Sequence, residues 1–307
     1  MKRVVVTGMA GITSLGSDWA SIEGCFTANR SGIRRMDEWD RFTELNTRLA
    51  GPIDDFTVPA HWPRKQLRSM GRVSRLAVGA AEQALLAGGA EELCPTEAMV
   101  FDALYATSLK NDAPHTSPRP YDSGRDGLVI GEGGGMLVLE ELEHALARGA
   151  RIHAEIVGFG SNADGVHTTR PEQVTMRRAM ELALGDANLP PEAIGYVNGH
   201  GTATEQGDIA ETLATHSLFG SRMPISSQKS FLGHTLGACG ALESWFSIEM
   251  MNRDRYIHTL NLDEVDERCG ELDYLQGEPR RMSHEFVMNN NFAFGGVNTS
   301  LILRRWS

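Results

Sequence analysis

The sequence predicts a layered α/β fold, because short apolar or β-branched runs alternate along it with segments of helical periodicity. A chain of 307 residues is long enough to bury a sizeable core. Its 33 glycines and only 7% aromatic residues favour closely packed layers joined by tight turns. No low-complexity segment or flexible linker interrupts the alternation.

The expected elements follow one another through the chain. Residues 3–8, "RVVVTG", form a β-branched run ended by glycine, which is typical of a buried strand. Residues 172–187 place Met176, Met180 and Leu184 on one helical face, which favours core packing. In chain order we expect strands at 3–8, 135–142, 152–160, 194–198, 223–227, 284–291 and 298–305, and helices at 18–29, 64–87, 143–149, 172–187, 206–217 and 234–253.

The net charge and the spacing of the cysteines argue against several classes of function. The net charge of -11 argues against nonspecific binding to nucleic acid or to an anionic membrane as the main role. The start "MKRVVVTGMAG" is too short in apolar residues for a signal peptide, so we expect a cytoplasmic protein. No CxxC pair or zinc spacing occurs, so neither a disulfide framework nor a metal is expected from the four cysteines, Cys25, Cys94, Cys239 and Cys269.

A glycine-rich segment at 131–135, "GEGGG", resembles a dinucleotide-binding loop only superficially. That fingerprint follows a strand and opens a helix, whereas a strand follows here. We therefore expect a tight turn that brings two backbones together.

Two histidines stand in settings that suit ligand chemistry. His200 lies in "VNGHGTATEQGD", directly after a strand, with Thr202 and Thr204 beside it; a structural role and a functional one are both open. His234 lies in "SSQKSFLGHTLGACGALE", at the opening of a helix and after Lys229. The positive end of that helix should keep the imidazole of His234 neutral and a hydrogen-bond donor. The Gly-rich loop "NNNFAFGGVNTS" could line an apolar channel with Phe292 and Phe294.

Together these motifs resemble the β-ketoacyl-acyl-carrier-protein synthases (ketosynthases), in particular ketosynthase II, of the thiolase superfamily. The resemblance covers essentially the whole chain, including "RVVVTGMAGITSLG" and "RPYDSGRDGLVIGEGGGMLVLEELEHALARGARIHAEIVGFG". It implies a thiolase-like layered αβαβα fold. It also implies decarboxylative Claisen condensation of malonyl-acyl-carrier protein (malonyl-ACP) with an acyl thioester, in fatty-acid or polyketide synthesis. "AEELCPTEAMVFDALYATSLKND" and "GHGTAT" resemble ketosynthases of aryl-polyene clusters.

The resemblance also implies roles for residues that match the motifs. His200 and His234 would donate hydrogen bonds to the malonyl thioester oxygen, and Lys229 would order the site electrostatically. Phe294 would be the gating phenylalanine whose backbone N–H serves the acyl oxyanion. The remaining substrate-binding or supporting residues would be Thr202, Thr204, Phe292, Asn298 and Glu243. No cofactor is implied, since substrates arrive on the phosphopantetheine of the carrier protein.

The nucleophilic cysteine that the resemblance implies is not identifiable. The family carries it in a "TAC-small-Ser/Gly" turn in the first half, and that motif is absent. We expect an N-terminal ketosynthase half at 1–150, internally truncated near 86–89, and a complete C-terminal half at 151–307. Cys94 falls after this seam. Cys239 is five residues beyond His234, about 140° around a helix, so we expect it to point away from the site and to pack as a small apolar residue.

Alternative functions stay open. One interpretation is a condensing enzyme from whose sequence an internal segment has been left out. Another is a non-condensing, chain-length-factor-like partner or an ACP-docking subunit, against which the retained histidines and lysine argue. A decarboxylase relying on the histidine pair is a third. We expect Arg64, Lys65 and Arg68 to dock the acidic carrier protein, and a homodimer or a ketosynthase-like heterodimer.

Overall fold

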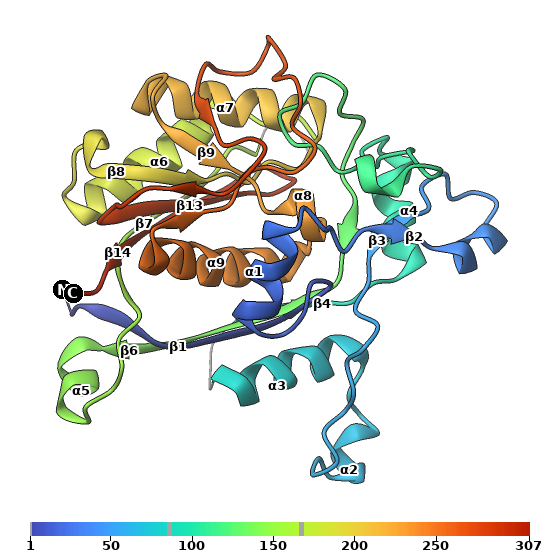
Figure 1. Cartoon of the computed structure of the whole chain (residues 1–307), viewed down its shortest axis with the longest axis horizontal. Helices are drawn as coiled ribbons and strands as arrows, with labels where there is room; N and C mark the ends of the chain where they lie inside the picture. Colours follow the sequence, from blue (N-terminus) through green and yellow to red (C-terminus); the bar gives the residue numbers. More distant parts are fainter. Residues whose placement is uncertain (1, 85–87, 166–168) are drawn as a thin grey trace.

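The computed structural model describes residues 2–84, 88–165 and 169–307, and it is built around one nine-stranded sheet (Figure 1). The strand order is β11-β9-β8-β13-β14-β7-β1-β6-β4. Its strands are β1 (Val4–Thr13), β4 (Gly88–Glu91), β6 (Gly133–Glu141), β7 (Ala154–Ala163), β8 (Ile194–Asn198), β9 (Pro224–Ser226), β11 (Asp273–Tyr274), β13 (Phe286–Phe292) and β14 (Val297–Arg305). Two small sheets pair β2 (Arg34–Arg35), β3 (Leu49–Gly51) and β5 (Ile130–Gly131), and β10 (Arg255–Tyr256) with β12 (Arg280–Arg281).

The helices cover the faces of this sheet. They are α1 (Trp19–Thr27), α2 (Arg64–Leu67), α3 (Arg72–Ala84), α4 (Pro95–Ala103), α5 (Leu142–Ala147), α6 (Gln173–Ala187), α7 (Glu205–Phe219), α8 (Lys229–Leu232) and α9 (Cys239–Arg253). Short 3-10 turns are η1 (Asp37–Arg41), η2 (Pro114–Thr116), η3 (Pro191–Ala193) and η4 (Leu236–Ala238).

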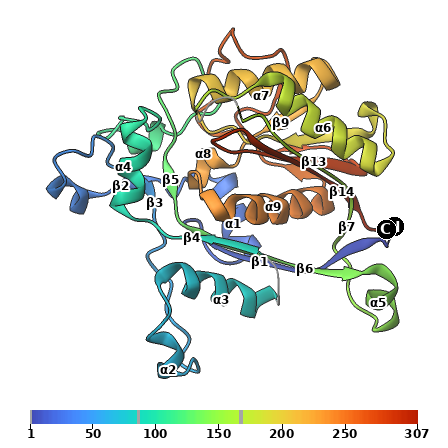
Figure 2. The same cartoon turned by 180° about the vertical axis from the view of Figure 1, so that it is seen from behind.

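The sheet folds back on itself around α9, which produces five layers (Figures 1 and 2). Helices α6 and α7 lie outermost over β7, β8, β13 and β14; α9 lies in the middle; β1, β6 and β4 follow, and α3 covers their outer face. A short antiparallel pairing of Val4–Val6 with Ala154–Ile156 joins the two parts of the sheet. The predicted αβαβα fold is confirmed.

The layers approach closely where glycine is present. A Cβ on Gly135 would lie 2.8 Å from the backbone nitrogen of Leu242 in α9, and one on Gly160 would lie 2.1 Å from the carbonyl oxygen of Ala179 in α6. Both distances are far below van der Waals contact. Residues 133–135 of the "GEGGG" segment are therefore strand residues of β6 against which a helix packs. The expected close approach is present, but the expected turn is wrong.

Two helix predictions are wrong at particular residues. The helix expected at 64–87 is interrupted between α2 and α3 at residues 68–71, where Ser69 and Gly71 disfavour helix; residues 85–87 lie outside the described part. The helix expected from 234 begins at Cys239. His234 cannot start it, because its N–H donates to Val129 and its carbonyl accepts from Gly131, 2.7 and 2.9 Å.

The first part of the chain contributes fewer described strands to the large sheet than the second. Strands β1, β4 and β6 come from residues 4–141, whereas the other six come from residues 154–305. The division into halves at 150 and 151 stays a prediction. Of the expected seam at 86–89, Gly88 and Gly89 open β4, and the two residues before them lie outside the described residues.

Candidate active site

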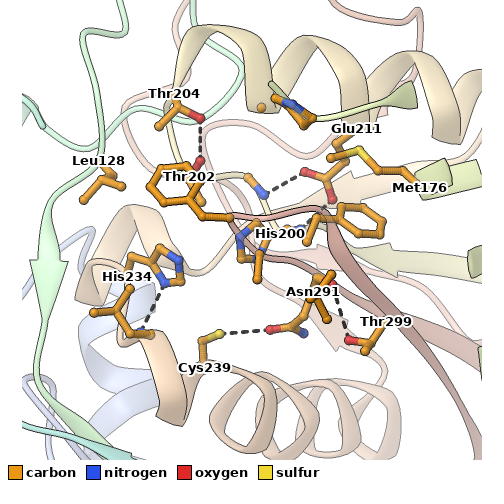
Figure 3. Close-up of a pocket in the computed structure, with 18 of the residues that line it drawn as sticks. Leu128, Met176, His200, Thr202, Thr204, Glu211, His234, Cys239, Asn291 and Thr299 are labelled. Atoms are coloured by element: carbon orange, nitrogen blue, oxygen red, sulfur yellow. Dashed lines mark hydrogen bonds between the residues drawn. The ribbon is translucent and has the colours of Figure 1, made fainter. Parts of the chain in front are cut away.

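A cavity of about 1080 Å³ lies between α9, the start of α7, α4 and the ends of β13 and β14 (Figure 3). His200, His234, Thr202 and Thr204 line it, as the sequence predicted for a shared site. The wall is otherwise largely apolar, with Phe101, Leu104, Phe159, Phe292 and Leu301. A cavity of this size and character can hold a small-molecule thioester with its acyl chain.

The loop that carries His200 is held by buried carboxylates of α7. Glu211 accepts hydrogen bonds from the backbone N–H groups of His200 and Gly201, at 2.6 and 2.7 Å, and Asp208 accepts from Thr202 at 3.0 Å. Burial raises the pKa of Glu211 to about 7 and that of Asp208 to about 6, although the donated N–H bonds oppose this. Both carboxylates were missed in the sequence. The sequence feature that could have indicated them is the spacing of Asp208 and Glu211, one turn apart in the helix that directly follows the His200 loop.

Lys229 is the buried charge at the centre of the site. Its side chain is 2% exposed, its ammonium pairs with the carboxylate of Glu243, and it lies 3.2 Å from Nδ1 of His200. Burial opposes the charged form, but the charge of Glu243 raises the pKa of Lys229 above its ordinary value. Glu243, which we expect to support the site, thus does so as the ion-pair partner of Lys229.

Both imidazoles are neutral, and both carry their proton on Nε2. The ammonium of Lys229 can only donate to Nδ1 of His200, and the backbone N–H of Leu236 donates to Nδ1 of His234 at 3.2 Å. Burial, followed by the positive charge of Lys229, lowers the pKa of each histidine well below its usual value. The lowered pKa of His234 agrees with the neutral imidazole predicted for that residue. Its cause is burial and Lys229 rather than a helix N-terminus, because α9 begins five residues after His234.

The two rings lie edge to face beside each other at the cavity wall. Their centroids are 5.1 Å apart at an interplanar angle of 84°. Within the part of the chain that the structure describes, Nε2 of His200 has no hydrogen-bond partner, although the residue is only 8% exposed. The arrangement can therefore present two N–H donors to one acceptor oxygen of a bound molecule.

Cys239 lines the same cavity, so the expectation that it points away from the site is wrong (Figure 3). Its position was counted along a helix from His234, but that helix begins only at Cys239. The thiol is 7% exposed and donates to Oδ1 of Asn291 at 2.9 Å. Burial, and then the charge of Glu243, raises the pKa of Cys239 to about 12. Cys94, by contrast, caps α4 and does not line the cavity.

The remaining predicted residues are placed as follows. The hydroxyls of Thr202 and Thr204 lie 2.8 Å apart at the cavity wall. The ring of Phe292 lies 6.3 Å from that of His200, whereas Phe294 is 40% exposed and packs on Phe101 at 5.5 Å. Asn298 is buried and donates to Asn162 in β7 rather than lining the cavity.

The expected docking cluster lies apart from the cavity. Arg64 and Lys65 belong to α2, which lies beyond α3 on the far side of the molecule from α7, and Arg68 follows it (Figures 1 and 2). All three side chains are exposed. Among the described residues, no group of three or more His, Cys, Asp or Glu could hold a metal ion, and no helix could span a membrane.

Comparison with family models decides the relationship. Residues 1–101 and 80–145 match the beta-ketoacyl synthase N-terminal domain, and residues 153–263 match the beta-ketoacyl synthase C-terminal domain. A crystal structure of a beta-ketoacyl synthase from Burkholderia phymatum STM815 is 47% identical with a TM-score of 0.98, over 100% of both chains. The chain belongs to the β-ketoacyl synthase family.

Curated β-ketoacyl synthases are similar but longer. The chain is 42% identical over 245 residues to 3-oxoacyl-[acyl-carrier-protein] synthase 2 of Coxiella burnetii, which covers 78% of this chain and 59% of that protein. It is 44% identical over 223 residues to 3-oxoacyl-[acyl-carrier-protein] synthase 1 of Escherichia coli K12. That match covers 72% of this chain and 54% of the Escherichia coli protein. The ishigamide ketosynthase/chain length factor is 26% identical with a TM-score of 0.86. The matched part thus spans less than three fifths of either curated relative.

Proposed function

We propose that this protein is a β-ketoacyl-ACP synthase that condenses malonyl-ACP with an acyl thioester and releases CO2. The observation that carries this proposal is the pair of neutral imidazoles, His200 and His234, whose Nε2–H groups serve one cavity. The family membership and the similarity to 3-oxoacyl-[acyl-carrier-protein] synthases support it.

The histidines would act on the decarboxylation step. As CO2 leaves the malonyl group, negative charge develops on the thioester oxygen, and two preorganised N–H donors stabilise it. Lys229 keeps His200 in the required tautomer, and Glu243 balances the buried charge of Lys229. The hydroxyls of Thr202 and Thr204 would receive the pantetheine amides at the cavity wall. The reaction needs no metal or cofactor beyond the phosphopantetheine that carries the substrate.

A second candidate is decarboxylation of malonyl thioesters without condensation. It is favoured because the histidine pair is complete while the family's cysteine motif is absent. The proposed truncation of the first half near 86–89 fits this absence. Its support is that the N-terminal family model matches in two stretches that overlap at 80–101, together with the shorter span of the chain.

The test measures three products. Purified protein is incubated with malonyl-ACP alone and with octanoyl-ACP added, and CO2, acetyl-ACP and β-ketoacyl-ACP are measured. Condensation predicts the β-ketoacyl product, and the second candidate predicts only acetyl-ACP. His200→Ala and His234→Ala should each lower CO2 release about 10²–10³-fold. His61→Ala, at an exposed histidine outside the cavity, should leave it unchanged. Equal rates in all three variants would rule out the proposal.

The proposed partner is an acyl carrier protein, and the proposed location is the cytoplasm. Charge reversal at Lys65 and Arg68 should raise the KM for the carrier protein and leave kcat unchanged. Arg222→Glu, at an exposed position between α7 and β9, serves as the control. An unchanged KM in the Lys65 and Arg68 variants would show that docking occurs elsewhere. Assembly as a homodimer, or with a ketosynthase-like partner, follows the same analogy, since one similar structure is a ketosynthase/chain length factor.

A further inference from the structure

The cavity contains a thiol that the proposed histidine chemistry does not use. Cys239 opens α9, lines the cavity together with His200 and His234, and is held by a hydrogen bond to Asn291 in β13 (Figure 3). Of the other three cysteines, Cys25 and Cys269 are buried elsewhere, and none lines the cavity. Within the described residues, Cys239 is therefore the sole thiol that shares a cavity with the two imidazole donors.

A second feature shows that the cavity is built to receive an acceptor group. His200 is more than nine-tenths buried, Lys229 fixes its Nδ1, and its Nε2–H has no partner among the described residues. A bound carbonyl oxygen in the cavity would accept this N–H. A thiol that lines the same cavity as such a donor supplies the nucleophile and the oxyanion donor that attack on a thioester uses.

We propose that Cys239 accepts the acyl group of a pantetheine thioester and holds it as an acyl-Cys239 thioester. The inference rests on the proposed function and deepens it, because it assigns the acyl-holding thiol to this chain. Sγ of Cys239 bonds to the thioester carbon, whose oxygen takes up negative charge at the Nε2–H of His200. The thiol releases its proton to solvent before it attacks; the bond between that carbon and the pantetheine sulfur then breaks, and the departing sulfur takes up a proton from solvent. No oxidant or other co-reactant is consumed.

The apolar wall gives the acyl chain a place. Phe101, Leu104, Phe159 and Leu301 line the part of the cavity contributed by α4 and by strands β7 and β14. Burial of each CH₂ stabilises a bound chain by about 0.8 kcal/mol, which is roughly fourfold in affinity. Acylation should therefore be faster with octanoyl than with acetyl thioesters at equal subsaturating concentrations.

The surroundings of Cys239 set a distinctive pH dependence. Burial, and then Glu243 on the same helix, raises the pKa of the thiol, whereas Lys229 on α8 lowers it. Glu91 of β4 accepts the N–H of nearby Gly237, and burial lowers the pKa of the two imidazoles. The net result is a pKa of about 12, so the thiolate fraction rises about tenfold per pH unit below it. The rate of acylation should rise accordingly between pH 7 and pH 9.

The test uses the purified full chain and octanoyl-pantetheine. Intact mass and peptide mapping should find one octanoyl group on Cys239 of the wild-type protein. Cys239→Ala should lose it. Cys269→Ala should keep it, because Cys269 is also buried and has a pKa raised to about 11 but lies outside the cavity. Mapping on the wild-type protein keeps the test decisive even if Cys239→Ala fails to fold.

The failures of the two proposals are distinguishable. No acylation, or acylation confined to another cysteine, overturns the assignment to Cys239. CO2 release from malonyl-pantetheine by the same wild-type sample tests the histidine pair independently. Release without acyl-Cys239 leaves the decarboxylation chemistry standing and removes only the role of the thiol. An acylation rate that does not change between pH 7 and pH 9 also contradicts the proposal, since attack by this thiol requires deprotonation.

Discussion

The buried pair of Lys229 and Glu243 allows a sharp test of what holds the site together. Their side chains are 2% and 4% exposed, and Oε2 of Glu243 has no hydrogen-bond partner within the described structure. Lys229→Met removes the cation and leaves Glu243 as an unpaired buried carboxylate. Breaking a buried ion pair from one side typically costs about 3–5 kcal/mol, a large share of the 5–15 kcal/mol that stabilises a protein.

Removing both charges should cost much less than the two single changes suggest. Glu243→Met alone leaves the Lys229 ammonium buried without its ion-pair partner. The double variant instead places two apolar side chains of similar length together. Such replacements are often close to neutral. We expect the free energy of unfolding of the double variant to fall by less than the sum of the single losses, by about 2 kcal/mol or more. Urea titration followed by tryptophan fluorescence measures this free energy, since Trp19 of α1 and Trp245 of α9 are buried in the core.

The pH dependence of Lys229→Met gives a second readout. Burial raises the pKa of Glu243 in the folded state, and Lys229 now opposes that rise. Without Lys229 the folded pKa rises further above the unfolded value, so stability is lost as pH rises through it. The variant should therefore lie closer to wild type at pH 5 than at pH 8. Additive single losses, or the opposite pH trend, would refute the reasoning.

Further predictions concern glycine packing and helix capping. Gly160→Ala should lower the free energy of unfolding by about 1–3 kcal/mol in urea titrations, because its Cβ would overlap the backbone of Ala179. Gly185→Ala is the matched control, because a Cβ at this position meets nothing within 4 Å. Since Gly185 lies within α6, the change to alanine should raise the free energy of unfolding by about 0.5–1 kcal/mol. The reverse order would contradict the packing of α6 on β7. Asp18→Ala should cost about 1 kcal/mol at pH 7, because Asp18 accepts the N–H of Ser21 at the start of α1. The Ser21 hydrogen bonds lower the pKa of Asp18, so the difference from wild type should shrink as pH falls below about 4 and Asp18 becomes protonated; a constant difference would argue against the cap.

The sequence was informative where a short segment determines its own structure. The β-branched run that opens β1 and the apolar face of α6 predicted their elements, since strand and helix periods are local properties. The position of His200 directly after a buried strand likewise indicated a ligand site, because the ends of such strands meet at one edge of a sheet.

It was uninformative where distant segments decide the outcome. The hydrogen bonds that His234 donates to Val129 and accepts from Gly131 keep it out of α9, and no local pattern around "GHTLG" signals them. Because α9 begins at Cys239 and not at His234, Cys239 lines the cavity. Glu211 and Asn291 acquire their roles only through contacts with His200 and Cys239, which lie 11 and 52 residues away in the chain.

The most direct test of the account is the proton position on the two histidines. Nitrogen-15 NMR of the imidazoles should find Nε2 protonated and Nδ1 unprotonated in both His200 and His234, with no titration between pH 6 and pH 8. His200→Gln and His234→Gln assign the signals. A protonated Nδ1, or titration of either residue near pH 6.5, would contradict the claim that two neutral donors face the substrate.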